Sequence, residues 1–173
     1  YTGFHAQILS AATGRVFIDP YAKGDLSLYM SYYTKDYTGG GGFTCEVTDI
    51  NPLPANPAVV TANCLGTTMR TYRLALACTG EYAVAVCSPS APTIPLTAAA
   101  MLTSMNRVNG VYETEVSLRM ILVANNNNLI YLDGASDPYT NNSGSTMLGE
   151  NQANIDGVIG AANYDIGHVF STG

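Results

Sequence analysis

TYRLALAC, residues 71–78, is a run of mostly apolar side chains near the middle of the chain. Side chains along a strand point to opposite faces in turn, so Tyr72, Leu74, Leu76 and Cys78 would share one face. The run therefore predicts a β-strand. The segments that follow it decide what kind of sheet this strand joins.

Helical and extended patterns alternate after this strand. Residues 97–112 have apolar side chains at three-and-four spacing, which predicts an amphipathic helix with Thr97 as its N-cap. VSLRMILVA, residues 116–124, is β-branched and apolar enough for a strand buried on both faces. Residues 145–160 predict a second helix, and residues 164–173 predict a final strand. This order requires crossover connections, so we expect an α/β fold, a mixed sheet with crossover helices.

The N-terminal part predicts a smaller β-rich segment. Apolar residues alternate on both sides of Gly14, which can take the positive φ of a tight turn, so a hairpin is expected. LYMSYY at 28–33 adds an aromatic strand. NPLPANPAV at 51–59 contains three prolines, each of which fixes φ and removes a hydrogen-bond donor, so this stretch is the expected domain boundary. The predicted parts are a β segment at 1–50, a Pro-rich linker at 51–68 and an α/β domain at 69–173.

The composition argues against several classes of partner. The chain has 173 residues, of which 12% are charged, and a formal net charge of −6; such a surface would repel a phosphate backbone, so nucleic acid is not expected. No stretch approaches the roughly 20 apolar residues of a membrane-spanning helix, so no membrane span is expected. The four cysteines and few lysines suit an oxidising, extracellular setting, and we expect a secreted protein.

Two histidines, His5 and His168, are too few for a zinc hydrolase. Such enzymes bind the metal through several neutral imidazoles at fixed spacing, and neither histidine begins an H-E-x-x-H pattern. His168 is best interpreted as a structural histidine in a buried strand. The G-x-S-x-G motif of serine hydrolases is also absent. These residues by themselves cannot build a hydrolytic centre.

Oxygen-bearing side chains gather after LIYLD, residues 129–133, which predicts a short partner strand. Asp133, Asp137 and Asn141 could hold calcium, although their spacing does not match the EF-hand series, and a solvated turn is the alternative interpretation. Asn141 also begins an N-x-S tripeptide, which is the acceptor for glycosylation.

Four longer runs are informative as whole segments: RTYRLALACTGEYA (70–83), MNRVNGVYE (105–113), DPYTNNSGSTMLGENQANIDGVIG (137–160) and YDIGHVFSTG (164–173). They resemble secreted bacterial members of the reprolysin-like, or adamalysin-type, zinc metallopeptidases. The resemblance implies a partial metzincin-like catalytic domain. YRLALAC would open that domain, 97–112 would be its first helix, and YDIGHVFSTG would be its third strand.

The family's zinc signature, H-E-x-x-H-x-x-G-x-x-H, lies downstream of that third strand, whereas this chain reaches only Gly173. We therefore expect a fragment of a secreted zinc endopeptidase precursor that is inactive alone. Zinc, the zinc-activated water and the protein or peptide substrates would belong to the full-length enzyme.

The resemblance also implies a role for Cys45. In adamalysin-type proenzymes a propeptide cysteine in a C-G-V-T context supplies its thiolate as the fourth zinc ligand and blocks the catalytic water. The chain has Cys45-Glu46-Val47-Thr48 after a run of glycines, so it departs from that context at Glu46. The alternative is that Cys45 pairs with another cysteine. The other disulfide candidates are Cys64, Cys78 and Cys87.

Two other functions stay open. The chain could be an extracellular structural module that assembles with copies of itself, because an unpaired strand at a sheet edge recruits strands from neighbouring chains. It could also be an inhibitory prodomain that acts on a protease in trans.

Overall fold

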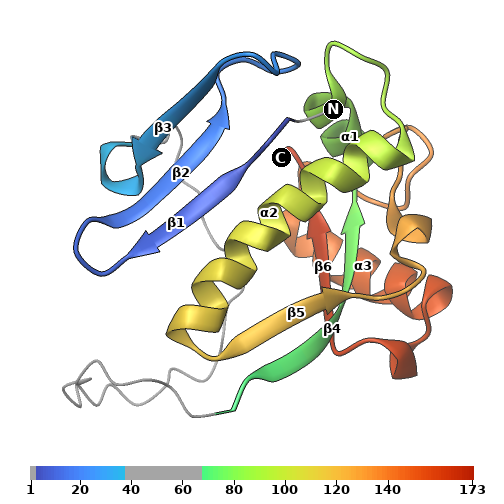
Figure 1. The fold of residues 1–173 in the computed structure, drawn as a ribbon. Helices are drawn as coiled ribbons and strands as arrows, with labels where there is room; N and C mark the ends of the chain where they lie inside the picture. Colours follow the sequence, from blue (N-terminus) through green and yellow to red (C-terminus); the bar gives the residue numbers. More distant parts are fainter. Residues whose placement is uncertain (1–2, 38–67) are drawn as a thin grey trace.

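The computed structural model describes residues 3–37 and 68–173, which form two sheets with helices (Figure 1). The antiparallel sheet near the N-terminus contains, in order, β1 (Ala6–Ser10), β2 (Gly14–Pro20) and β3 (Tyr29–Tyr33). The parallel sheet contains, in order, β5 (Leu118–Leu122), β4 (Arg70–Cys78) and β6 (Ile166–Phe170). The α/β class predicted from the order of elements is confirmed.

The predicted hairpin is present. β1 pairs with β2 so that Ile8 lies opposite Val16, and Gly14 has φ +81°, a conformation that glycine adopts without strain. β3 then pairs with the other edge of β2, with Tyr33 opposite Val16. The three strands therefore form a meander with β2 in the centre.

β4 is the centre of the parallel sheet. Leu74 lies opposite Leu122 of β5 on one side and opposite Ile166 of β6 on the other. From Leu74 to Cys78 every residue of β4 is buried, because this part of the strand has neighbours at its edges and helices over its two faces.

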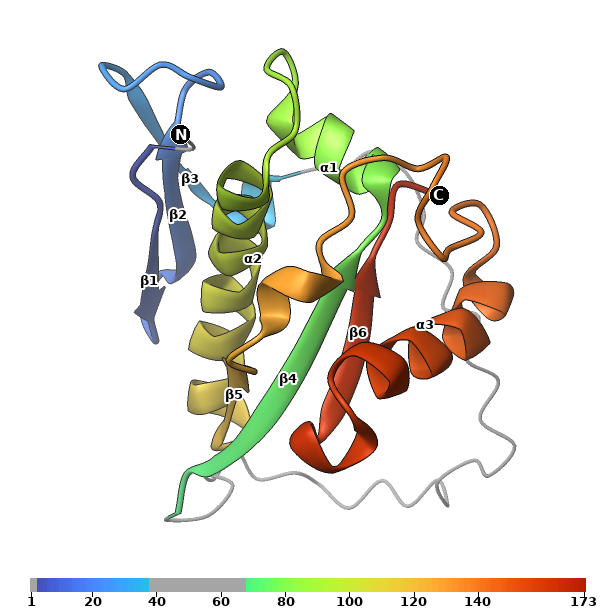
Figure 2. The same ribbon diagram turned by 90° about the vertical axis from the view of Figure 1, so that its right-hand side faces the viewer.

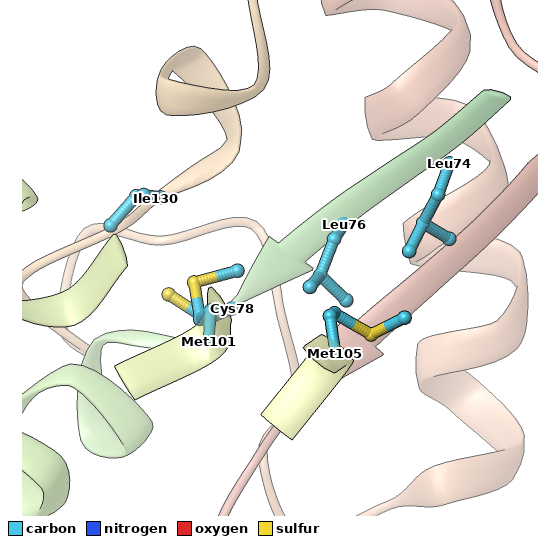
Figure 3. Packing of buried hydrophobic residues seen from close by; sticks show 6 residues of the cluster. All are labelled: Leu74, Leu76, Cys78, Met101, Met105 and Ile130. Atoms are coloured by element: carbon cyan, nitrogen blue, oxygen red, sulfur yellow. The ribbon is translucent and has the colours of Figure 1, made fainter. Parts of the chain in front are cut away.

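Helices α2 (Ile94–Glu115) and α3 (Gly144–Val158) lie on opposite faces of the parallel sheet (Figure 2). The α2 face is filled by a cluster of buried side chains (Figure 3): Leu74, Leu76, Cys78, Met101, Met105 and Ile130. The α3 face is filled by a second cluster: Ala75, Ala77, Leu129, Tyr139, Met147 and Ile155. The alternation of large and small residues along β4 thus serves two layers of core at once.

The helix boundaries differ in part from the predicted ones. α2 begins after Thr93, whose side chain accepts a hydrogen bond from the Leu96 N–H, and not after Thr97, which is buried within the helix. Pro95 fits here because the first turn of a helix needs no N–H from it. The sequence prediction missed α1 (Gly80–Cys87), which Thr79 caps directly after β4. The described residues also include three short 3₁₀ helices: Thr34–Asp36, Asn126–Leu129 and Ala161–Asn163.

Two strand predictions are corrected. Residues 116–124 give only the five-residue strand β5, which is an edge strand whose side chains alternate between half-buried and exposed rather than being buried on both faces. LIYLD, residues 129–133, does not form a strand; Ile130 makes an isolated parallel bridge to Cys78. The short 3₁₀ helix Asn126–Leu129 stands before that bridge, so the chain cannot run on as a partner strand.

The N-terminal sheet lies on the outer side of α2, away from the parallel sheet (Figure 2). Contacts between β1 and α2, and a hydrogen bond that Arg107 of α2 donates to Asp19 of β2, join the two parts. Along the described ranges, no helix is both long and apolar enough to cross a bilayer. The Pro-rich stretch 51–67, Cys45 and Cys64 lie outside the described residues, and the division into 1–50, 51–68 and 69–173 stays a prediction.

Candidate functional site

Polar side chains converge where β4 and β6 end, at the edge of a parallel sheet where ligands commonly bind. We call this group the carboxyl-edge cluster, and it consists of Thr79, Glu81, Asp133, Asp137, Asn141 and Thr172. Thr79 follows β4, Thr172 follows β6, and the loop after residue 132 brings the two aspartates and Asn141 to both strand ends. Three of these six residues are those predicted as a calcium loop.

Asp137 is bound to the start of α1. Its Oδ2 accepts a hydrogen bond of 2.6 Å from the Gly80 N–H, and its Oδ1 accepts one of 2.9 Å from the Tyr139 N–H. The first N–H groups of a helix have no partner within the helix, and a carboxylate there is favoured by the helix dipole. Asp137 therefore anchors the loop to α1.

Asn141 connects the ends of the two strands. Its Oδ1 accepts hydrogen bonds from the Thr79 hydroxyl at 3.0 Å and from the Thr172 N–H at 3.2 Å, while its Nδ2 donates to the Thr172 hydroxyl oxygen at 3.0 Å. Nδ2 is also the atom that would carry a glycan. In the structure Nδ2 donates to both the Thr172 hydroxyl and the Asn142 Oδ1, so a glycan would replace one of these two hydrogen bonds, and the acceptor stays a prediction.

Asp133 and Glu81 line a hollow of about 420 Å³ beside the cluster. The Asp133 carboxylate accepts from the Ala135 N–H at 3.0 Å and from the Ser136 hydroxyl at 3.1 Å. The Glu81 carboxyl group lies against Gly134, where a Cβ atom would come within 2.4 Å of the Glu81 Cδ. The absence of a side chain at Gly134 is therefore what makes room for Glu81.

The cluster links the loop after residue 132 to the ends of β4 and β6, and calcium binding there stays a prediction. The oxygens of Asp133, Asp137 and Asn141 already accept hydrogen bonds from the protein. Within 3–37 and 68–173, no group of three or more His, Cys, Asp or Glu side chains is placed to hold a metal ion. The calcium prediction gains no support from this geometry.

Zinc does not fit the described residues either. His5 lies before β1 and binds Asp19, with its Nδ1 2.6 Å from the Asp19 Oδ1, while His168 lies on β6 and packs edge-to-face on Phe170 at 5.4 Å between ring centroids. His168 is exposed rather than buried as predicted, although the protein atoms around it still desolvate the ring enough to lower its pKa. Cys45, the predicted zinc ligand, lies outside the described residues.

Cys78 and Cys87 are buried and form no disulfide among the described residues. The candidate set Cys64, Cys78 and Cys87 stays a prediction, because Cys64 lies outside those residues. The Cys78 Sγ lies 3.9 Å from the Tyr131 carbonyl oxygen, and the Cys87 Sγ lies 3.5 Å from the Thr97 Oγ1. Each thiol therefore has its own partner in the core. Burial raises the pKa of Cys78 to about 11, which disfavours the reactive thiolate.

We expect Cys78 and Cys87 to resist a thiol-specific alkylating reagent at pH 7.5 in the folded protein and to react at once in denaturant. The reason is that the thiolate is the reacting form: burial disfavours the thiolate of Cys78, and it shields both side chains from the reagent. Peptide mapping by mass spectrometry after alkylation measures this at each cysteine. A non-reduced digest in which either residue appears in a disulfide-linked peptide would contradict the free-thiol assignment.

A second polar group, which sequence reasoning missed, joins the N-terminal sheet to α2. Asp19 of β2 contacts His5, Tyr32 of β3 and Arg107 of α2. A charged residue within the apolar strand RVFIDP, and an arginine among the apolar residues of the predicted helix, were the available signals. The sequence does not predict that Asp19 and Arg107 pair, because the two residues are 88 positions apart.

This geometry defines a three-layer α/β domain. Its parallel sheet has α2 on one face and α3 on the other. Residues 98–173 of this domain match the model of a family described as metallo-peptidase family M12B, reprolysin-like. The match supports a reprolysin-like domain and includes α2, β5, α3 and β6. No curated protein and no solved structure gave a significant match.

Proposed function

We propose that the chain is a part of a secreted bacterial zinc endopeptidase precursor, with a propeptide end before the Pro-rich stretch and the first part of the catalytic domain after it. The observation that carries the proposal is the match of residues 98–173 to the reprolysin-like metallopeptidase family. Proteins are the substrates that a protease family implies. The architecture agrees with this, because α2 and β6 stand where the resemblance expects the first helix and the third strand.

The described residues contribute support for the fold, not chemistry. No imidazole set or group of three metal-ligating side chains comes together among the described residues of the carboxyl-edge cluster. The carboxylates of Asp133 and Asp137 accept hydrogen bonds from the protein, whereas the Glu81 Oε2 is buried without a partner in the described ranges. In the proposed precursor the zinc ligands and the glutamate base would therefore come from residues beyond these 173. Cys45 is proposed as the thiolate that would occupy the fourth zinc position before activation.

We expect the purified chain to show no chelator-sensitive cleavage of casein or gelatin when zinc is added, because the described residues hold no set of zinc ligands. Release of labelled peptide over several hours, with and without 1,10-phenanthroline, measures this. Cleavage that the chelator abolishes would overturn the proposal of inactivity.

The coding sequence of the natural gene tests the precursor proposal directly. An H-E-x-x-H pattern in the reading frame after Gly173 is expected, and a stop codon without that pattern would overturn the proposal. In a chain extended to include the pattern, Cys45→Ala should raise proteolysis before any propeptide cleavage, whereas Cys64→Ala should not, and equal activity of wild type and Cys45→Ala would argue against the latch.

The self-assembling alternative is not favoured. The outer edge of β5 is occupied at its centre, since the Asn109 amide of α2 accepts from the Met120 N–H at 2.9 Å and donates to the Met120 carbonyl oxygen at 2.8 Å. A side chain in this position stops another strand from pairing there.

A further inference from the structure

We infer that the outer face of α2 is a recognition surface for the N-terminal three-stranded sheet, and that the sheet stays bound there after the chain is cut between residues 38 and 67, held by Arg107 and Asp19. The inference goes beyond the proposed function, because it concerns the binding of two parts of this chain whether or not a protease follows. Its partner is a folded β-sheet that presents one carboxylate beside an aromatic ring.

The carboxylate of Asp19 is the centre of the contact. Its Oδ2 accepts a hydrogen bond of 2.7 Å from the Tyr32 hydroxyl, its Oδ1 lies 2.6 Å from the His5 Nδ1, and the Arg107 Nη2 also binds Oδ1. Only 16% of the Asp19 side chain is exposed. Strands β2 and β3, the segment before β1 and helix α2 therefore meet at this one acidic group.

Arg107 recognises two features of the sheet at once. Besides its ion pair with Asp19, its guanidinium carbon lies 4.8 Å from the centroid of the Phe17 ring, a cation–π geometry. Its Nε is buried and has no hydrogen-bond partner within the described ranges. If Asp19 were replaced, the partly desolvated positive charge of Arg107 would have no carboxylate partner. The contribution of each residue to binding therefore depends on the other.

The remaining contacts across this interface are weaker. Arg15 and Glu115 lie 3.7 Å apart with 43% and 59% of their side chains exposed, and Lys23 reaches the Ala85 carbonyl oxygen at 3.3 Å. Exposed pairs of this kind contribute little, because solvent and salt screen them.

Two hollows lie beside the Asp19–Arg107 contact. One of about 280 Å³ is lined by His5, Lys23 and Thr103 among others, and one of about 430 Å³ is lined by Gln7, Asn106 and Arg107 among others. The surface between sheet and helix is therefore not a continuous apolar core. The specific charge contact, rather than the apolar area, must supply most of the selectivity.

Asp19 is charged at neutral pH. His5, Tyr32 and Arg107 together keep the pKa of Asp19 below its usual value against the opposing effect of burial. The Asp19–Arg107 pair is thus available as an ion pair wherever the folded protein is studied at neutral pH.

The test uses the full chain with a recognition sequence for a specific protease in place of residues 39–42. After complete cutting under native conditions, the two fragments are separated by size exclusion at micromolar concentration, and their dissociation constant is measured by surface capture of the longer fragment. Wild-type fragments should elute together. Asp19→Asn and Arg107→Gln should each raise the dissociation constant at least tenfold. The double variant should have about the same dissociation constant as either single variant, because the two residues act through one contact.

Arg15→Gln is the matched control, since it removes the other arginine that forms an ion pair across this interface and should change the dissociation constant less than threefold. Protection of Cys78 and Cys87 from alkylation in every variant reports that the domain after residue 68 is still folded. Separation of the wild-type fragments on cutting would overturn the inference, as would unchanged binding in Asp19→Asn and Arg107→Gln. Neither result bears on the presence of a zinc motif after Gly173.

Discussion

Asn126→Ala is expected to lower the free energy of unfolding by about 2–6 kcal/mol, since it leaves two buried backbone groups without partners, at about 1–3 kcal/mol each. The Asn126 Oδ1 accepts from the Leu76 N–H at 2.8 Å, and its Nδ2 donates to the Leu76 carbonyl oxygen at 2.9 Å. Leu76 is fully buried in the central strand. Water cannot replace the lost amide without opening the core.

The position of Asn126 explains why its amide is needed. β5 ends at Leu122, opposite Leu74, and the next bridge to β4 is Ile130 with Cys78. Between them the edge of β4 has no strand beside it, and the amide of Asn126 supplies the donor and acceptor that a strand would give.

Urea unfolding followed by circular dichroism or by tyrosine fluorescence measures this effect, because the chain has 12 tyrosines and no tryptophan. Asn128→Ala is the control, as it removes an exposed asparagine of the same run and should change stability by less than about 0.5 kcal/mol. An equal free energy of unfolding in the two variants would show that the hydrogen bonds of the Asn126 amide do not stabilise the edge of β4.

Gly80→Ala is expected to destabilise the fold by about 3 kcal/mol or more, or to prevent folding, because overpacking and a lost hydrogen bond combine. A Cβ atom at residue 80 would lie 2.1 Å from the backbone carbon of Asp133 and from the backbone nitrogen of Gly134. These are backbone atoms, so the loop itself would have to move. That movement would break the bond between the Asp137 Oδ2 and the Gly80 N–H.

Gly149→Ala is the matched control for this substitution. Gly149 also lies in a helix, but a Cβ atom there would meet nothing within 4 Å. Because glycine is a poor helix former, alanine at 149 should stabilise the protein by roughly 0.5–1 kcal/mol. Thermal or urea unfolding of both variants should therefore give shifts of opposite sign, and a neutral Gly80→Ala would refute the close packing of α1 on the loop.

The carboxyl-edge cluster shows how far a site can be predicted from residue types. Asp133, Asp137 and Asn141 were found as a group because oxygen-bearing side chains recur in one loop, and the structure does bring them to one edge of the sheet. Their role could not be predicted, since it depends on which donors face them. Asp133 accepts from the nearby Ala135 and Ser136, but Gly80 donates to Asp137 and Thr172 donates to Asn141, and these two donors are distant in the sequence.

The pattern of apolar residues by itself determined the class of fold. Alternation along 71–78 and three-and-four spacing in 97–112 are local properties of the sequence. Alternation places apolar side chains on one face of a strand, and three-and-four spacing places them on one face of a helix, so each pattern predicts one element. The hairpin around Gly14 and the second helix follow from the same local rules.

Tertiary structure decided which strand is central, which thiols stay free and how the N-terminal sheet is attached. Residues 116–124 have more β-branched side chains than β4, yet β4 is the central strand, with a strand on each side and a helix on each face. The contacts of Asn126 with Leu76 and of Arg107 with Asp19 join residues 50 and 88 positions apart. Such long-range pairs produce no periodic pattern in the sequence. They stabilise the protein only once folding has brought both partners together and removed them from water.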